Sequence, residues 1–135
     1  MKHVLVIDSA ARTVTAECIP DTLEALQECV GGYIETGWQF PNGDVVFVNE
    51  EGLLQQPPGK DWFHIQGLYQ PFVGNGVCIG HNEEGESVDV KTSLEDLQKL
   101  IRFVDINTIA LVSHLNELKQ AEFWYSLHKS PQGER

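Results

Sequence analysis

An amphipathic helix is predicted near the N-terminus, between Asp21 and Gly31 or Gly32. Its apolar positions are three or four residues apart, which is the spacing of one helix face: Leu23, Leu26 and Val30. Asp21, followed three residues later by Glu24, is expected to cap the first turn. Gly31 or Gly32 is expected to end the helix, because glycine readily adopts the left-handed conformation required there.

Short apolar or alternating runs predict β-strands that are joined in pairs as hairpins. The predicted strands are residues 3–8, 13–18, 33–39, 45–48, 76–81 and 86–90. The first is apolar on both faces, which indicates a strand inside the sheet. In the second, Val14, Ala16 and Cys18 alternate with polar residues, so one face is solvated. Asn42 and Gly43 predict a type I′ turn in the second hairpin.

The sequence Asn-Glu-Glu-Gly occurs twice, at residues 49–52 and 82–85. In both places it follows a predicted strand, and its glycine suits the left-handed position of a turn. Residues 53–75 are the least regular part of the chain, with a Pro-Pro-Gly break and two aromatic clusters, at 61–65 and 69–72. We expect an ordered loop or a short helix that lies across the sheet.

Two further helices are predicted in the C-terminal third of the chain. The first has an apolar stripe at helical spacing, formed by Leu94, Leu97, Leu100, Ile101 and Val104. Its capping pair is either Thr92 with Glu95 or Ser93 with Asp96. The second helix is longer and begins at a cap formed by Asp105 or Asn107.

These elements predict an α+β fold. It consists of an antiparallel sheet of about six strands built from hairpins, one helix between hairpins, and two C-terminal helices, with the helices covering one face of the sheet. We expect an acidic β-rich core over residues 1–92, a helical pair over 93–129 packed on the same domain, and a flexible tail over 130–135. A chain of 135 residues, 41% of them hydrophobic, is sufficient for one core.

The segment LEALQECVGGYIE, followed by a predicted hairpin and by VNEEG, resembles a family of small acidic proteins. That family is encoded by phages, plasmids and other mobile elements and is described only as a domain of unknown function. The resemblance covers roughly residues 1–90, and its pattern is specific in order and spacing. It implies an origin in a mobile element and an accessory role in the cytoplasm. No catalytic residues are assigned in that family, so the resemblance implies none here.

Negative charge is concentrated in the first two thirds of the chain. Residues 1–90 hold 14 acidic and three basic residues, whereas residues 91–135 hold six of each. The formal net charge of −11 therefore lies in residues 1–90. Such a field repels nucleic acids and anionic membranes and attracts basic protein surfaces. Acidic residues also keep a small domain soluble, and the charge alone does not separate these two roles.

Several features are typical of a cytoplasmic protein. No run approaches the roughly 18 apolar residues of a membrane span. Asp8 interrupts the apolar run at the N-terminus before it reaches the length of a signal-peptide core. Cys18, Cys29 and Cys78 are an odd number of cysteines without paired spacing, so we expect reduced thiols rather than disulfides.

Sequence motifs for catalysis and cofactor binding are absent. There is no Walker loop, HExxH, GxSxG or CxxC motif. Residues 73–80 approach a dinucleotide fingerprint, but the third glycine is one residue late and the segment enters a predicted strand rather than a helix. His81 lies near Cys78 and Glu83, yet alternate residues of a hairpin point to opposite faces, so these residues do not define one metal site. We therefore predict a non-enzymatic protein without catalytic, metal or cofactor residues.

Three functions agree with these observations. The first is binding and modulation of a host protein with a basic surface, for example as an inhibitor of host defence, without direct binding of nucleic acid or membrane. The second is binding or sequestration of a small molecule such as a signalling nucleotide, although residues 1–90 offer only Lys2, Arg12 and Lys60 to hold a polyanion. The third is an enzyme whose site has no recognisable motif. Candidate binding residues are aromatic, histidine or acidic: Trp38, Glu50, Glu51, Trp62, His64, Tyr69, Glu83 and Glu84.

The last predicted helix gives a prediction about assembly. It is apolar on one side, without the acidic excess of the preceding residues, and includes Leu111, Leu115, Leu118, Ala121, Trp124 and Tyr125. Such a helix is either a self-association face or a part of the core of its own domain. Light scattering separates the two, because a homodimeric full-length chain with a folded monomeric Trp124→Glu variant would show an interface. A monomeric full-length chain together with an unfolded Trp124→Glu variant would show that this helix packs in the core instead.

Overall fold

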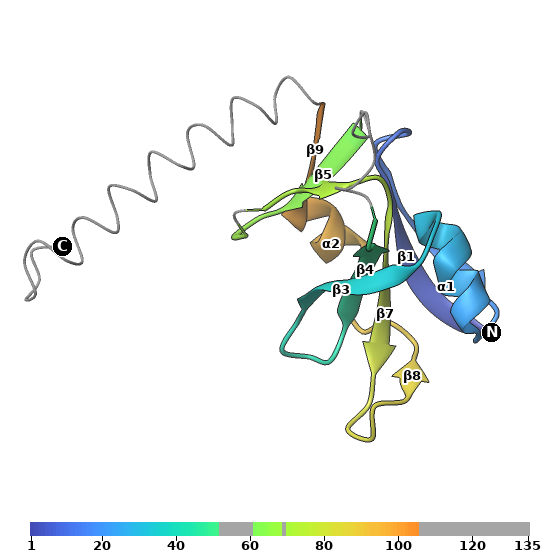
Figure 1. Cartoon of the computed structure of the whole chain (residues 1–135). Helices are drawn as coiled ribbons and strands as arrows, with labels where there is room; N and C mark the ends of the chain where they lie inside the picture. Colours follow the sequence, from blue (N-terminus) through green and yellow to red (C-terminus); the bar gives the residue numbers. More distant parts are fainter. Residues whose placement is uncertain (52–60, 69, 106–135) are drawn as a thin grey trace, which may run out of the picture.

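Two antiparallel sheets pack face to face, and a helix covers the outer face of the larger sheet (Figure 1). The computed structural model describes residues 1–51, 61–68 and 70–105. Its elements are β1 (Lys2–Asp8), β2 (Thr13–Ile19), α1 (Leu23–Val30), β3 (Ile34–Gln39), β4 (Val45–Asn49), β5 (Asp61–Ile65), β6 (Phe72–Val73), β7 (Gly76–His81), β8 (Ser87–Val88), α2 (Leu94–Leu100) and β9 (Ile101–Asp105). The predicted α+β class and the antiparallel sheet of about six strands are confirmed.

The larger sheet is organised around β7. Its strand order is β2-β1-β7-β4-β3, and β8 also pairs with β7. Cys78 is the register partner of both Leu5 in β1 and Val46 in β4, and both pairings are antiparallel. The residues of β7 from Gly76 to Gly80 are all buried, as expected for a strand covered on both faces. In the strand order of this sheet, β7 therefore lies between the hairpins β1–β2 and β3–β4.

The two faces of the larger sheet bury separate apolar clusters. On one face, Leu26 and Val30 of α1 pack against a cluster that includes Val77 and Ile79. The other face packs against the smaller sheet, β6-β5-β9, and against α2. This second cluster contains Leu5, Ile7, Val14, Val46, Val48, Phe63, Ile65, Cys78, Leu97 and Ile101. The prediction that the helices cover one face is therefore wrong, because α1 and α2 lie on opposite faces of the larger sheet.

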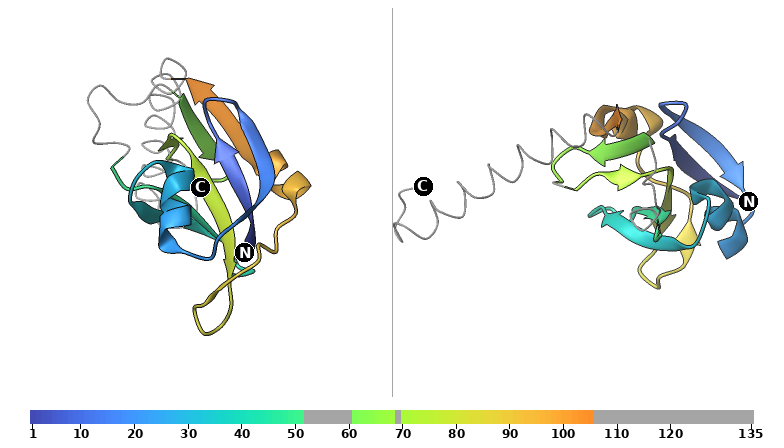
Figure 2. Two further views of the ribbon diagram at one scale, coloured as in Figure 1. Left: turned by 90° about the vertical axis from the view of Figure 1, so that its right-hand side faces the viewer. Right: turned by 45° about the horizontal axis from the view of Figure 1, so that its top comes forward.

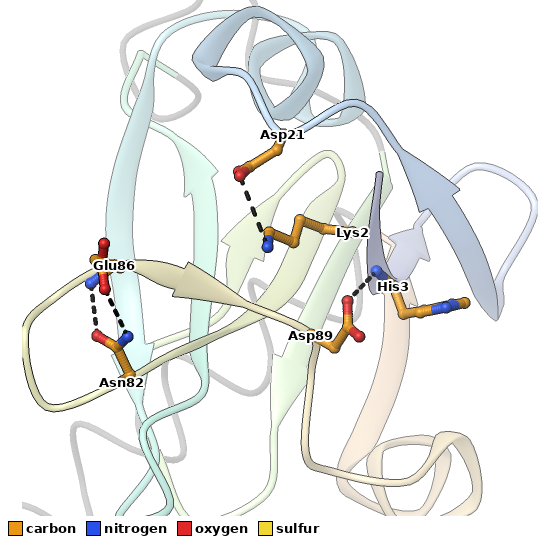
Figure 3. Close-up of polar contacts among 6 residues, drawn as sticks. All are labelled: Lys2, His3, Asp21, Asn82, Glu86 and Asp89. Carbon is orange, nitrogen blue, oxygen red and sulfur yellow. Dashed lines mark hydrogen bonds and ion pairs between the residues drawn. The ribbon is translucent and has the colours of Figure 1, made fainter.

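The start of α1 is one residue later than the predicted cap. Thr22 is the N-cap, because its backbone is extended (φ −138°, ψ 154°) and its hydroxyl accepts a hydrogen bond from Ala25 N. Asp21 instead forms an ion pair with Lys2, with 3.7 Å between Oδ2 and Nζ (Figure 3). The end of the helix is as predicted, since Gly31 has a φ of 82° and donates its N–H to a helix carbonyl.

The turn between β3 and β4 is wider than the predicted type I′ turn. That type requires positive φ at both central residues, but of Asn42 and Gly43 only Gly43 has it, at 97°. Gly43 N donates to Phe40 O at 3.1 Å, so Pro41 occupies the second turn position, where its fixed φ is favourable. The Asn42 side chain then accepts a hydrogen bond from Asp44 N at 2.9 Å.

Both Asn-Glu-Glu-Gly segments form turns through their asparagine side chains. Asn49 Oδ1 accepts from Glu51 N at 2.9 Å, and Asn82 Oδ1 accepts from Glu84 N at 3.0 Å. At the second segment, Gly85 has a φ of 83°, and Figure 3 shows the asparagine bonded across the turn. The predicted turn chemistry is therefore confirmed at residues 82–85, where the structure describes the whole segment.

The smaller sheet was not predicted. Residues 61–65 form β5 rather than a loop or a helix, and β5 pairs with β9 along its full length, ending at Ile65↔Ile101. Ser93 caps α2, but the helix ends at Leu100, and Ile101 has an extended backbone with φ −93° and ψ 134°. The predicted apolar stripe therefore crosses from a helix into a strand. Its last member, Val104, packs beside β5 and β6 instead of extending the helix face.

The helices of the structure are short. The helix α1 has eight residues and α2 has seven. Over residues 1–51, 61–68 and 70–105, no helix is long and apolar enough to cross a membrane. The second predicted C-terminal helix, from Asp105 or Asn107, lies outside the described residues.

A buried acidic side chain, Asp44, joins two distant parts of the chain. It is 0% exposed, and its carboxylate accepts hydrogen bonds from Lys91 N at 3.0 Å and Thr92 N at 2.7 Å. The Thr92 hydroxyl and the Asn42 amide also donate to it. Gly80 lies close by, because a Cβ there would be 3.2 Å from Asp44 Oδ1. The carboxylate thus holds the β3–β4 turn against the segment that leads into α2.

The three cysteines are free thiols in different environments. Cys18 is exposed on β2, and its Sγ lies 3.1 Å from Nδ1 of His3, its register partner on β1. Burial, together with two nearby glutamates, raises the pKa of Cys29. Cys78 lies in the core, where burial and the charge of Asp44 raise the pKa of its thiol to about 12.

Removing the Asp44 carboxylate should destabilise the fold. We expect Asp44→Ala to lower the free energy of unfolding by about 3 kcal/mol or more, because the donors from Lys91 and Thr92 lose their acceptor. Urea denaturation measures this change. Glu83→Ala, which removes one acidic group from an exposed turn, serves as the control and should change stability by less than about 0.5 kcal/mol. Equal losses for the two variants would contradict the role assigned to Asp44.

Alkylation by iodoacetamide at pH 8 should modify Cys18 first, Cys29 more slowly and Cys78 last. The thiolate is the reacting form, and a raised pKa lowers its population. At a pKa of about 12, roughly one Cys78 thiol in 10,000 is ionised at pH 8. Mass spectrometry over time gives the order, and in urea all three thiols should react at similar rates. Fast modification of Cys78 in the native protein would show that its burial is assigned wrongly.

Candidate functional site

The two sheets leave a groove along the β3 side of the larger sheet, with a volume of about 460 Å³. We call it the β3–β6 groove. Its walls come from β3 and β4 on one side and from residues 68 and 70–73, which lead into β6, on the other. In Figure 2 (right), the cyan β3 lies below the green β5 of the smaller sheet. The residues that give the groove its shape and chemistry are Glu35, Gly37, Trp38, Val48, Glu50 and Phe72.

A β-bulge in β3 directs Trp38 into this groove. The register between β3 and β4 shifts between Thr36 and Trp38. Glu35 is opposite Val48 before the shift, and Trp38 is opposite Val46 after it. Because Val46 and Val48 both point into the layer between the sheets, Trp38 joins Glu35 on that side instead of following Thr36 to the α1 side.

The residue inserted at the bulge is Gly37, and it lies against both walls of the groove. A Cβ at this position would be 3.0 Å from Val48 Cγ1 and 3.3 Å from the Phe72 ring. A Cβ at this position would therefore require the side chains of Val48 and Phe72 to shift by a few tenths of an ångström. The sequence-based prediction missed this residue, although an isolated glycine within a strand pattern is a signal for a bulge.

Aromatic rings lie on both sides of the groove. Trp38 is 38% exposed and meets the ring of Phe40 edge-on, with 6.4 Å between centroids. Phe72 packs against Phe63, a fully buried core residue, with 5.4 Å between centroids. Phe72 is thus held by the core, whereas Trp38 is accessible to a ligand.

The groove is acidic. Glu35 and Glu50 line it, whereas no lysine, arginine or histidine among the described residues does so. Carboxylates beside aromatic faces provide the two main attractions for an organic cation, an ion pair and a cation–π contact. Phosphate groups require the opposite charge or backbone N–H donors at a helix start. The groove therefore matches a cationic ligand better than a nucleotide.

Two of the predicted binding residues, Trp38 and Glu50, meet in this groove. Glu51 is exposed in the turn that follows Glu50. Glu83 and Glu84 are exposed in the turn between β7 and β8, and neither lines the groove. The two Asn-Glu-Glu-Gly turns thus do not form one acidic site.

The remaining predicted residues lie elsewhere. Trp62 is 8% exposed and belongs to a small apolar cluster on β5 and β6. His64 Nε2 contacts the carbonyl oxygen of Leu68, which ties the turn after β5 to the strand. Tyr69 lies outside the described residues. Phe72 belongs to the same aromatic segment and does line the groove. It was not among the predicted site residues.

A second hollow, of about 360 Å³, lies beside the start of α1. Leu26, Phe47 and Ile79 line it with His81. The ring of His81 meets Phe47 edge-on at 5.9 Å, and its Nδ1 is buried without a hydrogen-bond partner among the described residues. Cys78 belongs to the cluster on the other face of the sheet, so the two side chains do not share a site, as the alternation of the strand predicts.

The fold and the groove lie within a recognised protein family. No curated protein and no solved structure matches the chain. A family profile described as "Domain of unknown function (DUF3846)" matches residues 1–103, which extends from β1 through α2 into β9. The matched span is most of the 135 residues and contains every residue that lines the groove. The chain therefore belongs to the DUF3846 family, whose function is unknown.

Proposed function

We propose that this protein is a non-enzymatic accessory protein that binds a basic surface of another protein through the β3–β6 groove and thereby modulates its activity. The observation that carries this proposal is the lining of the groove. It combines the exposed ring of Trp38 and the ring of Phe72 with the carboxylates of Glu35 and Glu50, and no basic side chain of the described residues opposes them.

A lysine or arginine side chain would gain from both kinds of lining residue. A cation–π contact with Trp38 contributes about 0.5–2 kcal/mol, with the larger value where water is excluded. Glu35 and Glu50 add charge attraction within the same groove. The net charge of −11 accelerates encounter with basic partners, but salt screens it beyond about 8 Å at physiological strength. The contacts in the groove therefore set the affinity.

The proposed setting is a mobile genetic element, and the proposed partner is a host protein in the cytoplasm. The resemblance carried by LEALQECVGGYIE and VNEEG supports this setting. Host proteins that handle nucleic acids have basic surfaces, because they bind polyanions. An acidic groove that binds such a surface competes with nucleic acid for it. Inhibition of a host defence protein is therefore the form of modulation that we propose.

A short peptide rich in lysine and arginine should bind the wild-type protein, and isothermal titration calorimetry measures its affinity. Trp38→Ala should weaken binding by about 2- to 30-fold, because the cation–π contact is lost. The double variant Glu35→Lys with Glu50→Lys should remove detectable binding, since it places like charges in the groove. A glutamate-rich peptide of the same length should not bind the wild type.

The matched control is Glu83→Lys with Glu84→Lys, which makes the same change in net charge on the turn between β7 and β8. This variant should keep most of the affinity at physiological salt. Equal loss in both double variants would mean that net charge alone drives binding and that the groove is not the site. A host protein captured by chemical cross-linking should show the same order among the variants.

A further inference from the structure

The strand β3 is an edge of the larger sheet, directly beside the groove. In the part of the chain that the structure describes, β3 pairs with β4 alone. Glu50 N donates to Tyr33 O at 2.9 Å, and hydrogen-bonded positions recur at every second residue of an antiparallel ladder. The backbone N–H and C=O groups of Ile34 and Thr36 therefore point away from β4. Such groups are a template on which another strand can pair.

The side chains at this edge select the kind of strand that can pair there. A second copy of the chain, paired antiparallel in the register that sets Glu35 opposite Glu35, would bring like charges together, and such a pair destabilises the two strands. The net charge of −11 opposes the same self-pairing. A basic strand has the complementary charge, both for Glu35 and for the whole protein.

The bulge sets the spacing that such a strand requires. Glu35 and Trp38 lie on the same face of β3, because the bulge adds one residue between them. On a regular partner strand, residues i and i+2 share a face and are about 6.6–6.8 Å apart. Two cationic side chains at i and i+2 would therefore lie opposite Glu35 and Trp38, one for an ion pair and one for a cation–π contact.

We propose that an extended basic segment of the partner protein adds as a further strand to the edge of β3 opposite β4 and places lysine or arginine side chains, two residues apart, in the β3–β6 groove. This inference rests on the function proposed above. The backbone of β3 supplies hydrogen bonds to the added strand, and the groove selects its alternate side chains.

The test uses a synthetic peptide in which lysine alternates with valine, and two isomers of it that are N-methylated at alternate residues. One isomer is methylated at every lysine and the other at every valine. A strand that pairs along one edge uses the N–H groups of one set only. One isomer should therefore bind at least about 10-fold more weakly than the unmethylated peptide, and the other should bind within about 3-fold of it. Hydrogen exchange at the N–H of Thr36 should slow when the unmethylated peptide is bound.

The outcomes separate this inference from the function on which it rests. If the unmethylated peptide does not bind the wild-type protein, the proposed function itself fails. If it binds and the two isomers have equal affinities, whether both bind or both fail, strand addition is overturned while binding in the groove stands. Slower hydrogen exchange at the Thr36 N–H in the bound state, kept in Glu83→Lys with Glu84→Lys, places the added strand at β3, whereas unchanged exchange at Thr36 overturns that placement.

Discussion

The arrangement of the two sheets depends on the buried carboxylate of Asp44. A charged group at that depth is stable only when hydrogen bonds replace the water that it loses. Here the donors come from Asn42, Lys91 and Thr92. They belong to the turn of one hairpin and to the segment before α2, so a single side chain fixes where α2 begins. Because α2 leads directly into β9, and β9 pairs with β5, the position of the smaller sheet follows from the same contact.

The groove is an opening in the core rather than a site formed by loops alone. Val48 and Phe72 belong to the packing between the sheets, and at the β3 side this packing reaches the surface. Binding and stability therefore share these residues. Trp38 differs, because the bulge brings it to the groove while it stays outside the core clusters. It is the residue at which affinity can change with the least effect on the fold.

Local signals in the sequence were sufficient to predict the hairpins and turns of the larger sheet, but not the smaller sheet. The hairpins, the end of α1 at Gly31 and the turn at residues 82–85 follow from neighbouring residues, and the structure has them. The smaller sheet does not follow, because the apolar residues from Leu94 to Val104 fit a helix and a strand equally well until β5 is present to pair.

The sequence predicted only part of the candidate site, for the same reason. Trp38 and Glu50 have suitable chemistry in the sequence, but their meeting with Phe72 depends on packing between distant segments.

The central place of β7 has a consequence for synthesis on the ribosome. The strand β1 ends at Asp8, but the strand that pairs with its inner edge begins at Gly76. About 70 residues must be added in between, which takes several seconds at about 5–20 residues per second. During this time the hairpin β1–β2 exposes an apolar edge that has no partner in the nascent chain. We expect the sheet to assemble late, and the early chain to need protection from aggregation by a chaperone or by fast completion of translation.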